Sequence, residues 1–145
     1  MDASEDAKRA AKRVLELQEP GITKVVAFHS VEHHMLPPMI SLSYGNSYSI
    51  PGAQLSKIRE EYRKKGDEIL KATEKMFKEA NIEIDTRLIF DEAPEDYINH
   101  IVDEENFDLV AMGVKGDHSK LEEVFMGSVA QKVLNDVDCD VLAVR

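Results

Sequence analysis

The sequence has little of several features that mark other classes of protein. It contains one cysteine, Cys139, so an intramolecular disulfide is excluded and no cysteine spacing for a metal exists. Its apolar runs are only a few residues long, too short to span a bilayer. The N-terminus, Met1 to Asp6, is acidic where a secretory signal would be basic and then apolar. We therefore expect a soluble protein of the reducing cytoplasm, with no membrane partner.

Positive charge is also in short supply. Lysine and arginine number 18 against 28 acidic residues, so the formal net charge is -10. Because affinity for a phosphate backbone comes mainly from lysine and arginine, this balance predicts no nucleic-acid partner. Binding of an anionic nucleotide would have to be local, through backbone dipoles, a few cations or a metal ion.

Helical and strand patterns alternate along the chain. Apolar residues spaced three and four apart predict helices over residues 3–17, 54–80, 94–104 and 128–136. Apolar runs rich in β-branched residues predict strands over residues 22–28, 82–90, 109–113 and 141–144. Pro94 suits a first helical position, and Gly66 marks a place where the second helix could bend. We predict one α/β domain, residues 1–145, whose parallel sheet receives ligands beyond the carboxyl ends of its strands.

Glycines are concentrated between the third predicted strand and the last predicted helix. Ser128 and Gln131 form the S-x-x-Q pattern of a capping box, which predicts a helix start at Ser128. A helix start attracts phosphate oxygens, glycines allow close backbone approach, and Lys115 could add a cation. Glycines also end strands and precede helices in any α/β protein, and the Walker and G-x-G-x-x-G patterns are absent. Spacing alone leaves a phosphate cradle and a simple turn both open.

The stretch resembles the C-terminal signature of the universal stress protein family, which marks its ATP-binding members. That signature is Gly, two residues, Gly, nine residues, then Gly-Ser or Gly-Thr, and its fixed positions match Gly113, Gly116, Gly127 and Ser128. Residues 28–30 lie where the family's second strand commonly ends in His-Val, and residues 1–5 resemble its Asp-Gly-Ser-Glu turn. The resemblance covers essentially the whole chain and implies a flavodoxin-like, doubly wound parallel sheet of strand order 3-2-1-4-5.

The resemblance also implies a strand that is not predicted here. Family members carry a central strand immediately before the Asp-Gly-Ser-Glu turn, and this sequence starts at the turn. Removing that strand would leave its neighbours with unpaired backbone groups, which costs on the order of a few kcal/mol. A truncated sequence, a misassigned start and a strand supplied by a partner are the alternatives.

The resemblance implies ATP, with or without Mg²⁺, as the ligand. The family's contacts to phosphates and ribose carry over to Met112, Gly113, Gly116, Gly127, Ser128 and Val129, with Lys115 as the added cation. Asp2 and Ser30 are expected near the base. Three departures from the family pattern affect this transfer. Residues 117–126 make the spacer one residue longer, Ser30 replaces a valine that meets the adenine, and Glu92 replaces a glycine and adds negative charge.

Other polar clusters carry weaker indications. His29, Glu32, His33 and His34 include metal-ligand types but fit no zinc motif, so packing and solvation are favoured and no metal site is predicted. Asp117 and His118 could hold a metal ion or orient water, although solvated loop residues are the favoured interpretation. No nucleophile and base pair is evident, so no catalytic residue is predicted. Residues 31–53 form a long connection, either a pocket cover or partner surface, or a flexible crossover.

The last strand, Val141 to Arg145, resembles the family's edge strand, which pairs with its copy in a dimer. An uncovered edge invites such pairing, so a homodimer is expected. The sequence thus predicts a dimeric, ATP-binding stress-response or signalling module with at most slow ATP hydrolysis. The alternative is a family member without nucleotide that acts as a protein-interaction module. A phosphoaccepting receiver domain on the same fold is not supported, because no paired acidic residues close an early strand.

Overall fold

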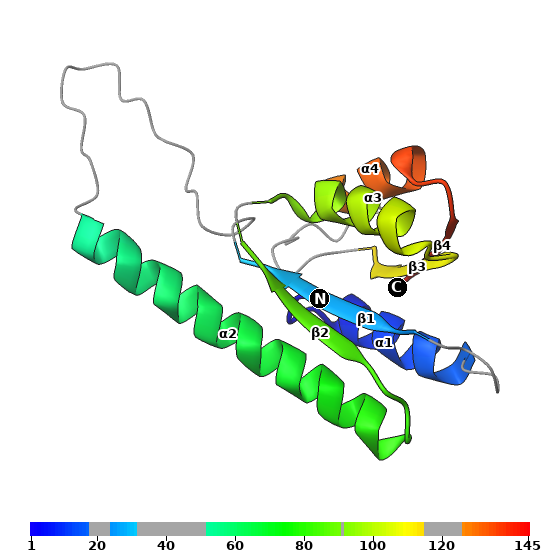
Figure 1. The fold of residues 1–145 in the computed structure, drawn as a ribbon, viewed down its shortest axis with the longest axis horizontal. Helices are drawn as coiled ribbons and strands as arrows, with labels where there is room; N and C mark the ends of the chain where they lie inside the picture. Colours follow the sequence, from blue (N-terminus) through cyan, green and yellow to red (C-terminus); the bar gives the residue numbers. More distant parts are fainter. Residues whose placement is uncertain (18–23, 32–51, 91, 115–125) are drawn as a thin grey trace.

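Helices and strands alternate along the chain as the sequence predicts (Figure 1). The computed structural model describes residues 1–17, 24–31, 52–90, 92–114 and 126–145. The helices are α1 (Glu5–Leu17), α2 (Gly52–Glu79), α3 (Pro94–Glu105) and α4 (Ser128–Asp136). The strands are β1 (Val26–Ser30), β2 (Asp85–Ile89), β3 (Leu109–Gly113) and β4 (Asp140–Val144). The first strand begins and ends later than residues 22–28, because its ladder with β2 runs from Val26 to Ser30.

The four strands form two parallel pairs. β1 pairs with β2, placing Phe28 opposite Arg87, and β3 pairs with β4, placing Ala111 opposite Leu142. Parallel strands joined by helical crossovers make the flavodoxin-like α/β fold that was predicted. β1 and β3 are the inner strands, and no strand in the described ranges joins them. The two pairs agree with the predicted order 3-2-1-4-5 without a strand at position 1.

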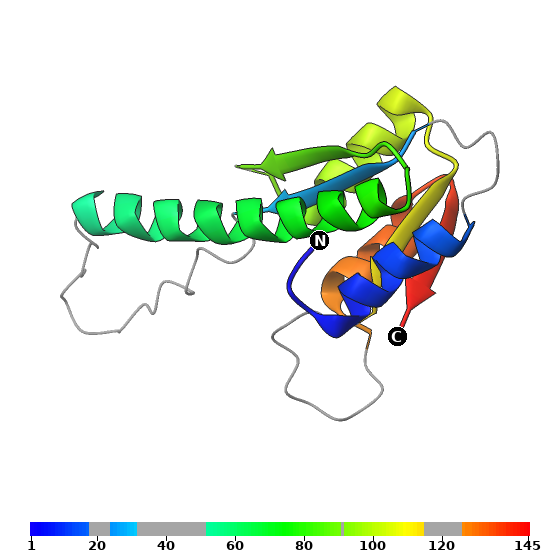
Figure 2. The same cartoon turned by 90° about the horizontal axis from the view of Figure 1, so that it is seen from below.

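Helices cover both faces of the strand pairs (Figures 1 and 2). α2 packs on β1 and β2, while α1 packs mainly on β3 and also touches β4. α3 and α4 pack against each other on the opposite face. Alternate residues of each strand therefore contact different helices. Both faces being covered agrees with the apolar sequences of β3 and of β4 after Asp140, whereas β2 begins with the polar residues 85–87.

The face beneath α3 and α4 holds the main apolar cluster. Ile98 and Val102 of α3 and Val133 of α4 are buried together. Phe28 of β1 packs against this cluster, and its ring centroid lies 4.7 Å from that of Tyr97. These contacts connect the β1 half of the molecule to α3, which leads into β3.

α2 is the longest helix and continues through Gly66 without interruption. A Cβ added at Gly66 would lie 2.6 Å from side-chain atoms of both His29 and Leu88. The glycine therefore serves close packing of α2 on β1 and β2, and the bend considered from the sequence does not occur. None of the helices in the described ranges combines the length and apolarity needed to cross a membrane.

Candidate functional site

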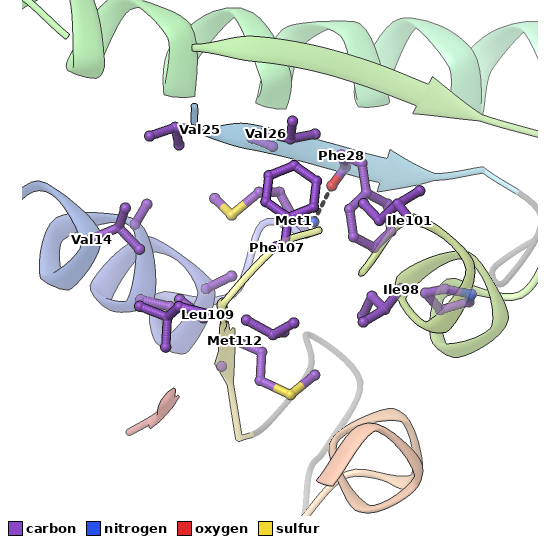
Figure 3. A pocket seen from close by; sticks show the side chains of 18 of the residues that line it. Met1, Val14, Val25, Val26, Phe28, Ile98, Ile101, Phe107, Leu109 and Met112 are labelled. Carbon is purple, nitrogen blue, oxygen red and sulfur yellow. Dashed lines mark hydrogen bonds between the residues drawn. The ribbon is translucent and has the colours of Figure 1, made fainter. Parts of the chain in front are cut away.

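A cavity of about 1130 Å³ opens at the carboxyl ends of the inner strands and continues between the two strand pairs (Figure 3). Most residues predicted to contact a nucleotide line it: Asp2, Ser30, Met112, Gly113, Gly127, Ser128 and Val129. The other two, Lys115 and Gly116, lie outside the described residues. The fold thus brings together residues from four separate segments of the sequence.

The start of α1 forms one wall of the cavity. The Ser4 side-chain oxygen accepts a hydrogen bond from the Ala7 amide at 3.1 Å, so Ser4 is the N-cap of α1. Asp2 supports this cap, because its Oδ1 accepts the Ser4 amide at 3.0 Å and the Ser4 hydroxyl at 2.5 Å. The Asp2 carboxylate, which the resemblance places near the base, therefore stabilises the start of α1 through Ser4. Ser4 itself was not predicted as a site residue, although serine directly before a helix is a sequence signal for a cap.

The end of β3 meets the first turn of α1. A Cβ added at Gly113 would lie 2.7 Å from the backbone nitrogen of Ala7, closer than real Cβ contacts allow. Gly113 is therefore required by packing, whether or not a ligand approaches it. The next residue, Val114, donates its amide to Val144 at 2.9 Å and accepts the Gly127 amide at 2.9 Å. These two bonds place the start of α4 at the end of β3, a role for Val114 that no sequence pattern indicated.

α4 begins at Ser128 as predicted, but the predicted capping box is wrong. The N-cap is Gly127, with extended backbone angles, and Ser128 is already the first helical residue. Gln131 is therefore the fourth helical residue, and its side chain donates to the Met126 carbonyl at 3.2 Å, while the Gly127 amide is bonded to the Val114 carbonyl. Within the described ranges no side chain caps this helix, so the Ser128 and Val129 amides have no side-chain acceptor there, and both residues line the cavity.

The end of β1 forms the opposite wall. The Ser30 hydroxyl donates to the Glu92 carbonyl at 3.0 Å, which holds the turn after β2 against β1. The Glu92 carboxylate lies 3.6 Å from His100 Nδ1 on α3. Glu104, followed by Glu92, raises the pKa of His100. The Glu92 carboxylate, which stands where the family has a glycine, therefore interacts with His100 on α3.

His29 lies beside the cavity with a neutral imidazole at neutral pH. Burial lowers the pKa of His29 below its ordinary value, and its Nδ1 donates to the Met1 carbonyl at 2.5 Å. The other members of its sequence cluster, residues 32–34, lie outside the described part of the chain, as do residues 117 and 118. Within the described part, no three metal-ligating side chains converge.

Several helix starts face this edge of the sheet, which favours an anion. The first residues of α4 and the Ser4 cap of α1 line the cavity, as does Pro94 at the start of α3. Each helix start carries the positive end of a macrodipole, and α4 adds uncapped amides. This arrangement can hold phosphate or carboxylate oxygens without a cationic side chain.

Two solved structures share the fold over nearly the whole chain. The hypothetical protein MJ0577 has a TM-score of 0.80 at 19% identity, covering 99% of this chain and 90% of that one. Universal stress protein UspA from Lactobacillus plantarum has a TM-score of 0.77 at 17% identity, and the match covers 100% of this chain and 93% of that one. Identities this low show the fold alone.

Two further structures of similar fold are named as nucleotide complexes. A universal stress protein in complex with cAMP has a TM-score of 0.59 at 21% identity, covering 100% of this chain and 91% of that one. A universal stress protein family protein from Arabidopsis thaliana with AMP bound has a TM-score of 0.57 at 17% identity, covering 94% and 76%.

The sequence comparisons point to the same family. Universal stress protein MJ0531 from Methanocaldococcus jannaschii is 28% identical over 144 residues, which cover 99% of this chain and 78% of that protein. The sequence profile of the universal stress protein family matches residues 1–145. With the fold and the glycine positions in agreement, this chain belongs to the universal stress protein family.

Proposed function

We propose that this protein binds ATP at the carboxyl edge of its strands and acts as a homodimeric stress-response or signalling module of the cytoplasm. The observation that carries the proposal is the uncapped start of α4, whose Ser128 and Val129 amides lie at the cavity. Related structures named as complexes with cAMP and AMP support a nucleotide as the ligand. Hydrolysis is expected to be slow at most.

The contacts follow from the local chemistry. Phosphate oxygens accept from the Ser128 and Val129 amides, where the α4 dipole also favours negative charge. Gly127 leaves room at the N-cap, because it has no side chain between the phosphates and the helix start. The ribose and base extend toward the end of β1, where the Ser30 oxygen still has acceptor capacity after its proton is donated to Glu92.

The first test is whether the purified protein carries or takes up nucleotide. Mild denaturation followed by chromatography detects ATP or AMP bound to the protein as purified. A melting scan with and without Mg-ATP detects added ligand, because a ligand that binds only the folded state raises its stability. Stoichiometric release, or a rise in melting temperature with Mg-ATP, supports the proposal. An empty protein with an unmoved melt contradicts it and favours the protein-interaction alternative.

A negative charge introduced at the start of α4 is expected to affect ATP affinity and protein stability in different directions. Ser128→Glu places a carboxylate at the first helical position, where it stabilises α4 but repels phosphate. We expect the melting temperature without ligand to stay level or rise, while ATP affinity falls about tenfold or more, equivalent to ~1.4 kcal/mol. Asn135→Glu is the matched control, with the same charge on the last turn of α4. Equal ATP affinity in the two variants would contradict a phosphate site at Ser128.

The proposed homodimer forms through β4. The hydrogen bonds from the Asp140 amide to the Asp108 carbonyl and from the Val114 amide to the Val144 carbonyl turn the even-numbered residues of β4 toward β3. The Val141 and Ala143 backbone groups therefore point to the outer edge. Ala143→Pro removes an outward donor without removing a bond to β3. We expect light scattering after gel filtration to show monomer for this variant and dimer for Ala143→Val, and a dimer in both would contradict pairing through β4.

A further inference from the structure

The outer side of β2 presents backbone groups to which no other described residue is hydrogen-bonded. β2 bonds to β1 through its odd-numbered residues, since the Asp85 amide donates to Val25 and the Ile89 carbonyl accepts a bond of the same length, 2.9 Å. Successive residues of a strand point their backbone groups to opposite sides. The N–H and C=O groups of Thr86 and Leu88 therefore point away from β1. Figure 2 shows β2 as the outer strand of its pair.

The charged side chains of β2 are paired within the molecule. Arg87 lies on the α3 face, where its guanidinium donates to Glu105 and, at 2.8 Å, to the Asp85 carboxylate. Leu88 lies on the other face, against Gly66 of α2. Recognition of charge beside the outer side of β2 is therefore left to α2.

α2 extends well beyond the carboxyl end of β2 (Figures 1 and 2). Gly66 packs on Leu88, near the end of β2, and is buried. The preceding residues 56–65 are all half-buried or exposed, whereas Leu70 and Phe77 further along the helix are buried. This part of α2 therefore stands clear of the strand pair over roughly 15 Å, at 1.5 Å per residue. We call residues 56–65 the overhang.

A second cavity, of about 440 Å³, lies between the overhang and the end of β2. Phe90, directly after β2, lines it with 38% of its surface exposed. The overhang contributes Ser56, Arg59, Glu60 and Arg63, whose spacing of three and four places them on one face of the helix. Arg63 reaches Glu60 only at 4.0 Å, with both side chains more than half exposed, so this guanidinium can turn to another carboxylate.

The overhang is basic although the protein as a whole is acidic, with a formal net charge of -10. An acidic partner is therefore attracted to it, whereas a second copy of this acidic chain is repelled on average. Such attraction acts over about 8 to 10 Å at physiological salt. The basic residues of the overhang outnumber its two acidic residues, and they are Lys57, Arg59, Arg63, Lys64 and Lys65.

We propose that β2 and the overhang bind an extended acidic segment of a partner protein. The segment pairs with the outer side of β2, and it places an apolar side chain against Phe90 and a carboxylate beside Arg59 and Arg63. Main-chain bonds to Thr86 and Leu88 supply affinity without sequence preference, while the cavity and the guanidinium groups supply the preference. The surface is separate from the cavity at Ser128, so this inference does not depend on nucleotide binding.

Selection from a displayed library of short random peptides, followed by hydrogen exchange with a selected peptide, tests this surface. The selected peptides are expected to combine acidic residues with an apolar one and to bind more weakly as salt is raised. Bound peptide should slow exchange of the Thr86 and Leu88 amides at least about tenfold relative to the Arg87 amide, which bonds to β1. The absence of any selected peptide, selection of basic peptides, or unchanged Thr86 and Leu88 exchange would overturn the proposal.

Charge reversal at two places on α2 separates this surface from general attraction. Arg59→Glu combined with Arg63→Glu is expected to weaken the selected peptide at least about tenfold. Lys71→Glu combined with Lys75→Glu is the matched control, with the same spacing and charge change at exposed positions away from the cavity, and should bind like the unchanged protein. Equal weakening in both would overturn the proposal. Protection of the same β2 amides that grows with protein concentration without peptide would also overturn it, because the occupant would then be a second copy.

Discussion

The two ends of the cavity have backbone groups that no helix or strand of the described residues pairs, and these groups differ in pattern. At the carboxyl edge, the groups are amides of one helix start, Ser128 and Val129, which point the same way. In the space between β1 and β3, which we call the slot, they are the alternating donors and acceptors that point away from β2 and β4, those of Val26, Phe28 and Ser30 and of Leu109, Ala111 and Gly113. Donors that converge suit a small anion, and alternating rows suit another strand.

The side chains around the two ends of the cavity also differ, polar at the carboxyl edge and mainly apolar in the slot. The edge carries polar side chains with defined partners, such as Ser4 with Asp2 and Ser30 with the Glu92 carbonyl. The slot is lined mainly by aliphatic and aromatic side chains, and the Met1 ammonium is buried there. Unsatisfied groups in a protein therefore indicate a type of ligand only when their direction and surroundings are considered together.

Gly113 lies where the edge and the slot meet, and replacing it is expected to have the largest effect. In Gly113→Val the Cβ would come within 2.7 Å of the Ala7 nitrogen and force α1 away from β3. We expect a loss of about 3 kcal/mol in the free energy of unfolding. Ala111→Val, two residues earlier on the same face of β3, adds bulk beside the cavity and is expected to change little. Urea unfolding measures both, and a Gly113→Val chain of unchanged stability would contradict the contact between α1 and β3.

The Met1 ammonium is expected to make the slot sensitive to pH. Burial lowers its pKa from 8.0 to about 6, so between these values the unfolded chain binds more protons and stability rises with pH. The buried ammonium lowers the free energy of unfolding by about 2 to 3 kcal/mol below about pH 6, and this loss disappears above pH 8.

Urea unfolding at several pH values, with and without Nα-acetylation, measures this effect. The acetylated chain is expected to lose the rise between about pH 6 and 8. His29, whose pKa is also lowered by burial, adds acid sensitivity at lower pH in both chains. Parallel curves for the two chains would show that the ammonium is exposed to water.

A smaller effect is expected at the edge, from the cap of α1. Ser4→Ala removes the acceptor of the Ala7 amide and should destabilise the protein by about 1 kcal/mol, or ~3 °C in melting temperature. Ser4→Thr keeps the hydroxyl and serves as the control. The loss in the free energy of unfolding should be the same at every pH between about 6 and 8, because the substitution leaves the Met1 ammonium in place. Equal melting temperatures for the alanine and threonine variants would contradict the cap.

The sequence predicted the elements well because their patterns are local. The predicted bounds of β3 and α4 match the structure, and Pro94 begins α3 as expected. The capping box failed because the N-cap is Gly127 and not Ser128, so Gln131 is no longer the third helical residue that would reach the N-cap amide, while the Gly127 amide is bonded to the Val114 carbonyl. Gly66 was interpreted as a weak point of a helix, because its packing against His29 and Leu88 depends on residues far along the chain.

The sequence by itself determined the α/β class, the order of helices and strands, and the family, since periodicity and spaced glycines are local signals. Only the tertiary structure decided which strands pair, why Gly113 has no side chain, and that a slot lies between β1 and β3. The physical reason is that strand pairing and close packing join residues distant in sequence, and their geometry depends on all the elements that surround them.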